Sequence, residues 1–327
     1  MRHFMEKKKR SKSGCLILVG AGPGDPELMS IKGLRALQAA DIILYDNLVN
    51  PKVFDLAFGE FNHEDKNQKH WLEKLNLSPD DFDPASALED WLPSRRPNRV
   101  KPRKSQSISV HYDVVSSNGL PELIYVGKKH GQKHNSQERI NEIILEKLEL
   151  GKTVVRLKGG DPFIFARGVE ELEVAEQNGF EYQIIPGLTS GLALPVNSGI
   201  ALTLRAKSDS VSLVTGHEIT NQKIDNWVRL LDLGSSLVIY MGLINIVEIR
   251  TKLLEAVEES MPIAAISCGS TEDEKVIYSS LGSITQDLIN KSIKSPTILV
   301  VGKHIKQNFK PSKFNLKSKK PEHSFAI

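Results

Sequence analysis

The sequence CLILVGAGPGD, residues 15–25, decides the fold, because an apolar run there ends in a glycine-rich turn. Residues 15–19 are typical of a buried strand, and the apolar spacing of residues 31–40 is typical of a helix that packs on a sheet. A second apolar run follows at residues 42–45. Strand, helix and strand in this order predict a β-α-β unit of a parallel sheet.

The same alternation continues along most of the chain. Further strands are expected at residues 123–126, 154–157, 182–185, 211–215, 237–241, 263–268 and 297–301, and helices at 137–150, 169–178, 245–257 and 284–290. The pattern restarts after Pro186, so the sequence predicts an α/β protein of two domains, 14–185 and 186–306, with mostly parallel sheets.

Three segments do not fit this alternation. Residues 1–13 and 307–327 are expected to be basic tails. Residues 60–121 are polar and proline-rich, and a structureless segment of this length is uncommon inside a compact domain. We therefore expect 60–121 to be an insertion into the first domain, with a short helix near residues 71–77 and no part in catalysis.

The composition excludes several classes of protein. The chain has 327 residues, of which 40% are hydrophobic and 25% charged, as in a soluble globular protein. The net charge of +3 is too small to indicate a nucleic-acid partner. No apolar run approaches the ~18–20 residues of a membrane helix, so no membrane partner is expected. The basic N-terminus lacks the apolar segment of a secretory signal, which favours a cytoplasmic protein.

The cysteines and histidines do not indicate a metal site. Cys15 and Cys268 lie in separate apolar runs, which predicts two buried, reduced thiols. His130 and His134 are four residues apart, but no third ligand lies near them. We therefore expect no bound metal.

The first strand ends in a loop with three glycines, GAGPGD at residues 20–25. It resembles a dinucleotide fingerprint, and Asp46 after the second strand would suit a ribose-binding acid. However, Asp25 stands where the third glycine should be, and Pro23 removes a backbone donor that pyrophosphate would need. A loop that closely approaches an uncharged or cationic ligand fits better, and a purely structural turn is the other alternative.

Three more loops follow strands. GGDPFIF at residues 159–165 combines two glycines, a carboxylate and aromatic side chains that can wall a flat ring. PGLTS at residues 186–190 supplies two hydroxyls, which would serve equally well as helix caps. YMG at residues 240–242 is a weak signal alone, since a core methionine is more common than a ligand-facing one. Ligands of open α/β sheets bind at such strand ends.

Together these strings resemble the uroporphyrinogen-III C-methyltransferases of the tetrapyrrole methylase family. The resemblance rests on LVGAGPGDPEL (18–28), ADIILYDNLV (40–49), YVGKK (125–129), QERIN (137–141), VVRLKGGDPFIFARG (154–168), IIPGLTS (184–190), VTGHE (214–218), YMG (240–242) and SPTILVVG (295–302). It implies the class III methyltransferase fold of two α/β domains with a cleft between them. It also implies S-adenosylmethionine as methyl donor, a tetrapyrrole substrate and a homodimer.

The resemblance also implies roles for individual residues. The cofactor-binding positions are Pro23, Gly159, Gly160, Asp161, Ile164, Thr189, Ser190, Met241 and Gly269. Asp46 matches the family's proton acceptor, and Lys128 in the VGK motif matches its proton donor. The implied reaction is two methyl transfers that convert uroporphyrinogen III to precorrin-2 for sirohaem or corrinoid synthesis. A later precorrin methylase and a non-catalytic homologue that binds the cofactor or a tetrapyrrole are the alternatives.

The chain departs from the family pattern at several points. Leu204 replaces the histidine of a THR motif, Ala166 and Val169 change the FGRGGEE motif, and Lys133 stands where many members have histidine. The insertion has no family counterpart. These departures bear on substrate geometry more than on cofactor binding. Residues 124–158 nevertheless carry eight Lys or Arg against four Glu, which suits a polycarboxylate substrate and would equally suit a charged helix face.

Overall fold

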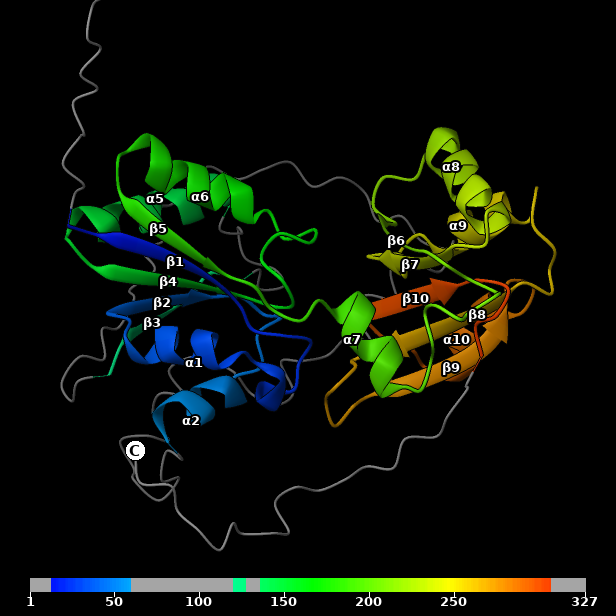
Figure 1. The fold of residues 1–327 in the computed structure, drawn as a ribbon, viewed down its shortest axis with the longest axis horizontal. Helices are drawn as coiled ribbons and strands as arrows, with labels where there is room; N and C mark the ends of the chain where they lie inside the picture. Colours follow the sequence, from blue (N-terminus) through cyan, green and yellow to red (C-terminus); the bar gives the residue numbers. More distant parts are fainter. Residues whose placement is uncertain (1–12, 60–119, 128–135, 307–327) are drawn as a thin grey trace, which may run out of the picture. The chain divides into compact units, whose positions relative to one another are not determined.

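A computed structural model describes residues 13–59, 120–127 and 136–306. The expected helix near residues 71–77, most of the insertion, the tails and Lys128 lie outside these ranges. The chain forms two compact units (Figure 1). The first comprises the residues up to Ala193 with Ser267–Glu274 and Ile293–Thr297, and the second comprises the remainder.

The first unit is a parallel sheet with helices on both faces. Its strands lie in the order β3-β2-β4-β1-β5, and every neighbouring pair in it is parallel. The strands are β1 (Cys15–Gly20), β2 (Ile42–Tyr45), β3 (Glu122–Tyr125), β4 (Thr153–Lys158) and β5 (Glu181–Ile185). Helices α1 (Ile31–Gln38) and α2 (Lys52–Phe58) cover one face, and α5 (Gln137–Glu149) and α6 (Gly168–Gln177) the other (Figure 1).

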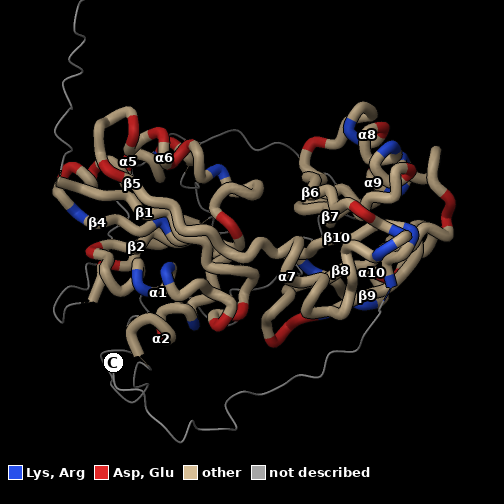
Figure 2. Tube along the Cα trace, in the orientation of Figure 1, with Lys and Arg blue, Asp and Glu red and all other residues tan. Residues whose placement is uncertain are grey.

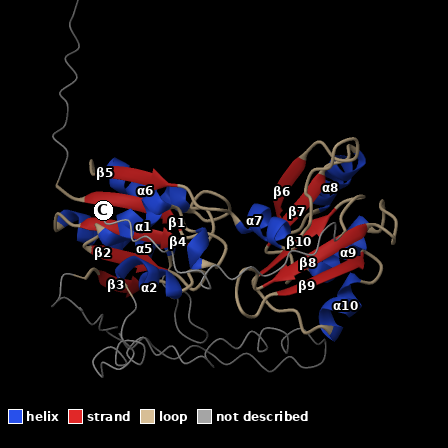
Figure 3. Ribbon diagram, turned by 60° about the horizontal axis from the view of Figure 1, so that its bottom comes forward, coloured by secondary structure: helices blue, strands red, loops and turns tan. Residues whose placement is uncertain are grey.

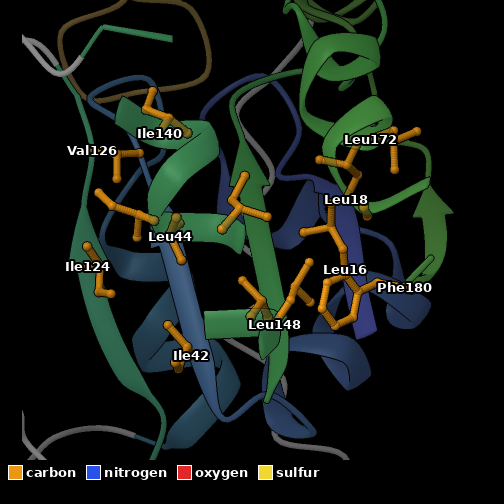
Figure 4. Packing of buried hydrophobic residues seen from close by; sticks show 14 residues of the cluster. Leu16, Leu18, Ile42, Leu44, Ile124, Val126, Ile140, Leu148, Leu172 and Phe180 are labelled. Carbon is orange, nitrogen blue, oxygen red and sulfur yellow. The ribbon is translucent and has the colours of Figure 1, made fainter. Parts of the chain in front are cut away.

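The alternation of side chains along each strand builds two apolar layers. Leu16 and Leu18 of β1 pack with Leu148 of α5 and Leu172 of α6 in one buried cluster (Figure 4). The alternate residues of β1, Ile17 and Val19, pack on the other face against α1 and α2. This two-sided burial explains why β1, β2 and β4 appear in the sequence as mostly apolar runs.

The second unit contains a mixed five-stranded sheet in the order β6-β7-β10-β8-β9. Its strands are β6 (Val211–Thr215), β7 (Ser236–Tyr240), β8 (Pro262–Ser267), β9 (Lys275–Ser280) and β10 (Thr297–Val301), and its helices are α8 (Asn221–Asp232), α9 (Ile246–Leu253) and α10 (Ile284–Asn290). Helix α7 (Ser190–Asn197) runs from the first unit into the second. Strands β6 and β7 are parallel, whereas β10 runs antiparallel to β7. Hydrophobic periodicity does not encode strand direction, so the sequence did not predict the antiparallel pair.

The strands and helices of the expected pattern are present, with further elements between them (Figure 3). Helix α8 was not predicted, although Ile224, Trp227 and Leu231 are buried at helical spacing and Thr220 caps its first turn. The short helix α2, the turn η1 (Pro26–Leu28) and strand β9 were also not predicted. Charged residues lie mostly on helices and loops (Figure 2). Among the described residues, no helix is long and apolar enough to span a bilayer.

The prediction that both thiols are buried was wrong. Cys15 and Cys268 are unpaired, but both are only half-buried. Cys15 opens β1 close to the end of the sheet, and Cys268 follows β8 with a positive φ of 47°. Partial burial of the Cys15 thiol, and then the negative charge of Glu181, raise the pKa of this thiol.

Candidate functional site

The candidate site of the first unit lies at one edge of its sheet. The five strands are parallel, so their carboxyl ends meet at the same edge. The loops that begin there after β1, β2, β4 and β5 contain Pro23, Asp46, Gly159 to Ile164, and Thr189 with Ser190. The strand order therefore brings together residues that are up to 167 positions apart.

Four glycines at these strand ends and loops pack backbone against backbone. A Cβ added to Gly20 would lie 2.5 Å from the Gly187 nitrogen and 2.6 Å from the Gly160 oxygen. Gly22 and Gly160 also form an antiparallel bridge, with N–O distances of 3.2 and 2.7 Å. The glycines thus allow loops to contact each other, and the Gly22 amide is already used. This arrangement disfavours the dinucleotide interpretation of GAGPGD, in which that amide would bind pyrophosphate.

Asp161 connects two of the loops. Its Oδ1 accepts a hydrogen bond from the Phe163 amide at 2.9 Å, and its Oδ2 accepts one from the Gly187 amide at 3.1 Å. Each carboxylate oxygen has a second lone pair, so Asp161 can still accept from a ligand. The sequence predicted only the ligand role of Asp161 and not this structural one, because Gly187 is 26 residues away.

Gly269 lies in a loop that belongs to the first unit. A Cβ on Gly24, next to Pro23, would lie 3.0 Å from the Gly269 oxygen. On the other side of the same glycine, the Asn50 side chain donates to the Gly24 oxygen at 2.8 Å. The structure therefore places Pro23 and Gly269 on neighbouring loops. Met241 belongs to the second unit, where it follows β7 half-exposed with a φ of 53°.

Thr189 and the aromatic residues complete the edge. Thr189 is buried, and its carbonyl accepts from the Leu192 and Ala193 amides in the first turn of α7. Phe163 and Phe165 belong to the glycine-rich loop after β4 and keep 45% and 41% of their surface exposed. Phe165 has a positive φ of 54°, an unusual conformation for an aromatic residue and one that is enriched at ligand sites.

Asp46 lies at the carboxyl end of β2 with 19% of its side chain exposed. Its Oδ1 accepts from the Leu48 amide at 3.1 Å, and its Oδ2 accepts from a terminal nitrogen of Arg156 at 2.9 Å. Burial, and then the charge of Asp46, raises the pKa of the neighbouring Tyr125 phenol. Asp46 is thus a fixed carboxylate that still reaches solvent.

Three buried charged residues behind Asp46 were not predicted from the sequence as part of the site. Arg156 and Lys158 of β4 point toward α6, where the Glu171 side chain is fully buried. Glu171 accepts from Arg156 Nε at 3.0 Å and from Lys158 Nζ at 2.9 Å with each of its oxygens. The signal in the sequence was a strand, VVRLK, in which charges alternate with apolar residues.

The surroundings determine the ionisation of these groups. Burial disfavours the charged form of Arg156, but the negative charges and hydrogen bonds of Glu171 and Asp46 outweigh this effect and raise the pKa of Arg156. Burial, and then the neighbouring Arg156 cation, lowers the pKa of Lys158, although Glu171 opposes the shift. No set of three His, Cys, Asp or Glu side chains within the described ranges is arranged to hold a metal ion.

A doubly wound parallel sheet with glycine-rich loops and a fixed carboxylate at its carboxyl edge defines an α/β protein that binds small molecules. Residues 15–285 match the Tetrapyrrole (Corrin/Porphyrin) Methylases. The chain belongs to this family.

Relatives of this chain carry more specific names. A uroporphyrinogen-III C-methyltransferase of Bacillus subtilis is 33% identical over 96% of this chain and 100% of its own length. A siroheme synthase of Blochmanniella pennsylvanica is 34% identical over 98% of this chain, which spans only 54% of that protein. The crystal structure of a uroporphyrin-III C-methyltransferase from Thermus thermophilus complexed with S-adenyl homocysteine is 26% identical, with a TM-score of 0.59 over 88% of this chain and 97% of that one.

Proposed function

We propose that this protein is an S-adenosylmethionine-dependent C-methyltransferase that converts uroporphyrinogen III to precorrin-2 by two methyl transfers. The observation that carries the proposal is the carboxyl edge of the first sheet, where Asp46 reaches solvent beside the loops of the cofactor positions. Similarity to the Bacillus subtilis enzyme over 96% of this chain and the whole of that protein supports the same substrate. The product would enter sirohaem or corrinoid synthesis.

The loops of the first unit suit a cationic cofactor. Residues 20–25, 159–166 and 186–190 contain two aspartates and no Lys or Arg, so they would not repel a sulfonium. We assign cofactor binding to Pro23, Gly159, Gly160, Asp161, Ile164, Thr189, Ser190, Met241 and Gly269. S-adenosylmethionine supplies an electrophilic methyl group when it is bound.

Asp46 is assigned to proton removal. An electron-rich pyrrole carbon that accepts a methyl group gains a positive charge, and loss of a proton restores neutrality. The carboxylate of Asp46 accepts that proton at an oxygen that Arg156 and the Leu48 amide hold in place. Lys128 is assigned as the proton donor on the basis of the VGK motif, and it lies outside the described residues.

We further propose that the protein acts as a cytoplasmic homodimer without a metal ion. Two unpaired cysteines are consistent with a reducing compartment. The family resemblance supports the dimer. A later precorrin methylase, or a homologue that binds without catalysis, remains the alternative to the proposed enzyme.

The decisive experiment incubates purified protein with uroporphyrinogen III and S-adenosylmethionine and measures the red-fluorescent oxidised products. The proposed enzyme forms these products at a rate that depends on both compounds. A later precorrin methylase would leave uroporphyrinogen III unchanged but methylate a precorrin. A binding-only homologue would form no product with either substrate while it still bound S-adenosylhomocysteine in calorimetry.

The role of Asp46 is tested by Asp46→Asn. We expect the affinity for S-adenosylhomocysteine to stay unchanged and turnover to fall by about 10²-fold or more, the usual scale for a lost acid/base group. Asp41→Asn is the matched control, because Asp41 precedes the amino end of the same strand and binds the Thr153 amide there. The control should keep wild-type turnover. Wild-type turnover in Asp46→Asn would reduce Asp46 to a structural residue.

A further inference from the structure

The four charged residues Asp46, Arg156, Lys158 and Glu171 form what we call the buried charge cluster. Their side chains are 19%, 3%, 5% and 0% exposed, in that order. Glu171 is therefore fully buried, and Asp46, at the carboxyl edge of the sheet, is the most exposed of the four. The cluster joins three elements, since Asp46 follows β2, Arg156 and Lys158 belong to β4, and Glu171 belongs to α6. Its formal charge is balanced, with two acids and two bases.

All three nitrogens of the Arg156 guanidinium have partners. Nε donates to Glu171 at 3.0 Å, one terminal nitrogen donates to the Leu157 carbonyl at 2.7 Å, and the other donates to Asp46 at 2.9 Å. The planar guanidinium holds its donors in a fixed geometry. Because Glu171 and the strand carbonyl fix the plane of the group, they also fix the direction from which it meets Asp46.

Stability alone does not account for this arrangement. Arg156 is level with Leu18 and Leu44 on the neighbouring strands, in the layer that faces α5 and α6. Replacement of a buried ion pair by well-packed apolar residues is often neutral or stabilising. An apolar residue at this position would pack in the core but would leave the Asp46 carboxylate without its partner.

We propose that Arg156 is a positioning residue that holds the carboxylate of Asp46 in its productive orientation, that Glu171 holds Arg156 in turn, and that Lys158 holds Glu171. This inference rests on the proposed role of Asp46 as proton acceptor. Arg156 lies behind the carboxylate and acts through it. A shift of about 1 Å in a reacting group can lower turnover by ~10²-fold, so fixing this one carboxylate is sufficient to affect the rate.

The test is a double-mutant cycle with Arg156→Lys and Asp46→Asn. Lysine keeps the charge but cannot contact Glu171, Asp46 and the Leu157 carbonyl in one fixed plane. We expect Arg156→Lys to lower kcat by about 10-fold or more, with KM for both substrates and the affinity for S-adenosylhomocysteine within about twofold of wild type. In the Asp46→Asn background, the same change should have no further effect on kcat.

Two more variants complete the experiment. Glu171→Gln is nearly isosteric and should also lower kcat only where Asp46 is present, which provides the test if Arg156→Lys fails to fold. Lys147→Met is the matched control, because Lys147 forms a half-buried pair with Glu122 at 3.5 Å elsewhere in the same unit. Thermal unfolding of each variant separates loss of folding from loss of rate.

Each outcome decides the inference. Wild-type kcat in both Arg156→Lys and Glu171→Gln, with a slow Asp46→Asn, would overturn the positioning role and leave the proposed function intact. Additive losses in the double variants would also overturn it, because a merely structural role lowers kcat whether Asp46 is present or not. A wild-type protein without methyltransferase activity would contradict the proposed function and the inference with it.

Discussion

Asp161 connects two loops of the site and is also proposed to bind the cofactor, and both roles predict a large effect of its removal. Asp161→Ala deletes the acceptor of the Phe163 and Gly187 amides together with a carboxylate that is proposed to bind the cationic cofactor. We expect S-adenosylhomocysteine affinity to fall at least 10-fold in calorimetry and the free energy of unfolding to fall by about 1–3 kcal/mol. Unchanged affinity would contradict the assignment of the cofactor site.

Asp161→Asn separates the two functions, because the amide oxygen still accepts one hydrogen bond but carries no charge. It should retain most of the stability that Asp161→Ala loses, while its affinity for the cationic S-adenosylmethionine falls. Stability equal to that of Asp161→Ala would show that both carboxylate oxygens are needed to connect the loops.

The hydroxyl of Tyr45 is a buried polar group that is surrounded by apolar packing. Its ring makes edge contacts with Phe54 and Tyr125, and its hydroxyl is buried with no hydrogen-bond partner among the described residues. Burial, and then the neighbouring Tyr125, raises the pKa of this phenol. The desolvated hydroxyl costs free energy that a phenylalanine would not.

We therefore expect Tyr45→Phe to raise the free energy of unfolding by about 1 kcal/mol in a denaturant titration. Tyr278→Phe provides the comparison, because the Tyr278 hydroxyl donates to the Ser198 carbonyl at 2.7 Å and its loss should lower stability. A destabilised Tyr45→Phe would mean that the hydroxyl has a partner after all.

At the scale of elements, the contact between the loops after β1, β4 and β5 is the most demanding feature of the site. A Cβ on Gly187 would overlap the Gly160 carbonyl oxygen and lie 2.7 Å from the Gly20 Cα. These neighbours are backbone atoms, so relief requires the loops to separate rather than a side chain to rotate. The separation would also break the contact of Asp161 with the Gly187 amide.

Gly187→Ala should therefore lower the free energy of unfolding by about 1–3 kcal/mol, the range for overpacking, and weaken S-adenosylhomocysteine binding. Thermal unfolding and calorimetry measure the two effects. Gly302→Ala is the control, because its nearest new contact is the Ile305 side chain at 3.2 Å and lies outside the site. Equal effects of the two substitutions would show that the loop contact is not rigid.

At the scale of the whole molecule, the described residues on either side of the insertion are held close together. The Ala57 carbonyl accepts from the Gln38 side chain, and the Glu122 amide donates to the Asp41 carbonyl. Gln38 and Asp41 are three residues apart, which is at most about 11 Å of extended chain. With the reach of the glutamine side chain, Ala57 and Glu122 lie on the order of 20 Å apart at most.

A flexible linker can therefore replace residues 62–119. About ten Gly and Ser residues have a root-mean-square span of roughly 16–19 Å, and closing a shorter loop costs less entropy. We expect the deletion protein to fold with a similar unfolding temperature and to keep most of its methyl-transfer rate. An insoluble or inactive deletion protein would show that the insertion contributes to the fold or to catalysis.

Much of this molecule is determined by local features of the sequence. Mostly apolar runs of four or five residues predicted β1, β2 and β4, because a strand buried on both faces has few polar positions. The loops at the strand ends are contiguous strings, so the sequence also identified the family. Helix α8 was not predicted although its buried residues recur at helical spacing, and β9 was not predicted because its burial does not alternate along the strand.

The tertiary structure alone decided which residues meet. Arg156 and Lys158 bind Glu171, which is 15 and 13 residues away in the sequence. Arg156 also binds Asp46, which is 110 residues away in the sequence. The second contact exists only because β4 lies beside β2, an order that hydrophobic periodicity does not encode. Periodicity shows that a side chain points inward, and the partner it meets there depends on the order of strands and the packing of helices.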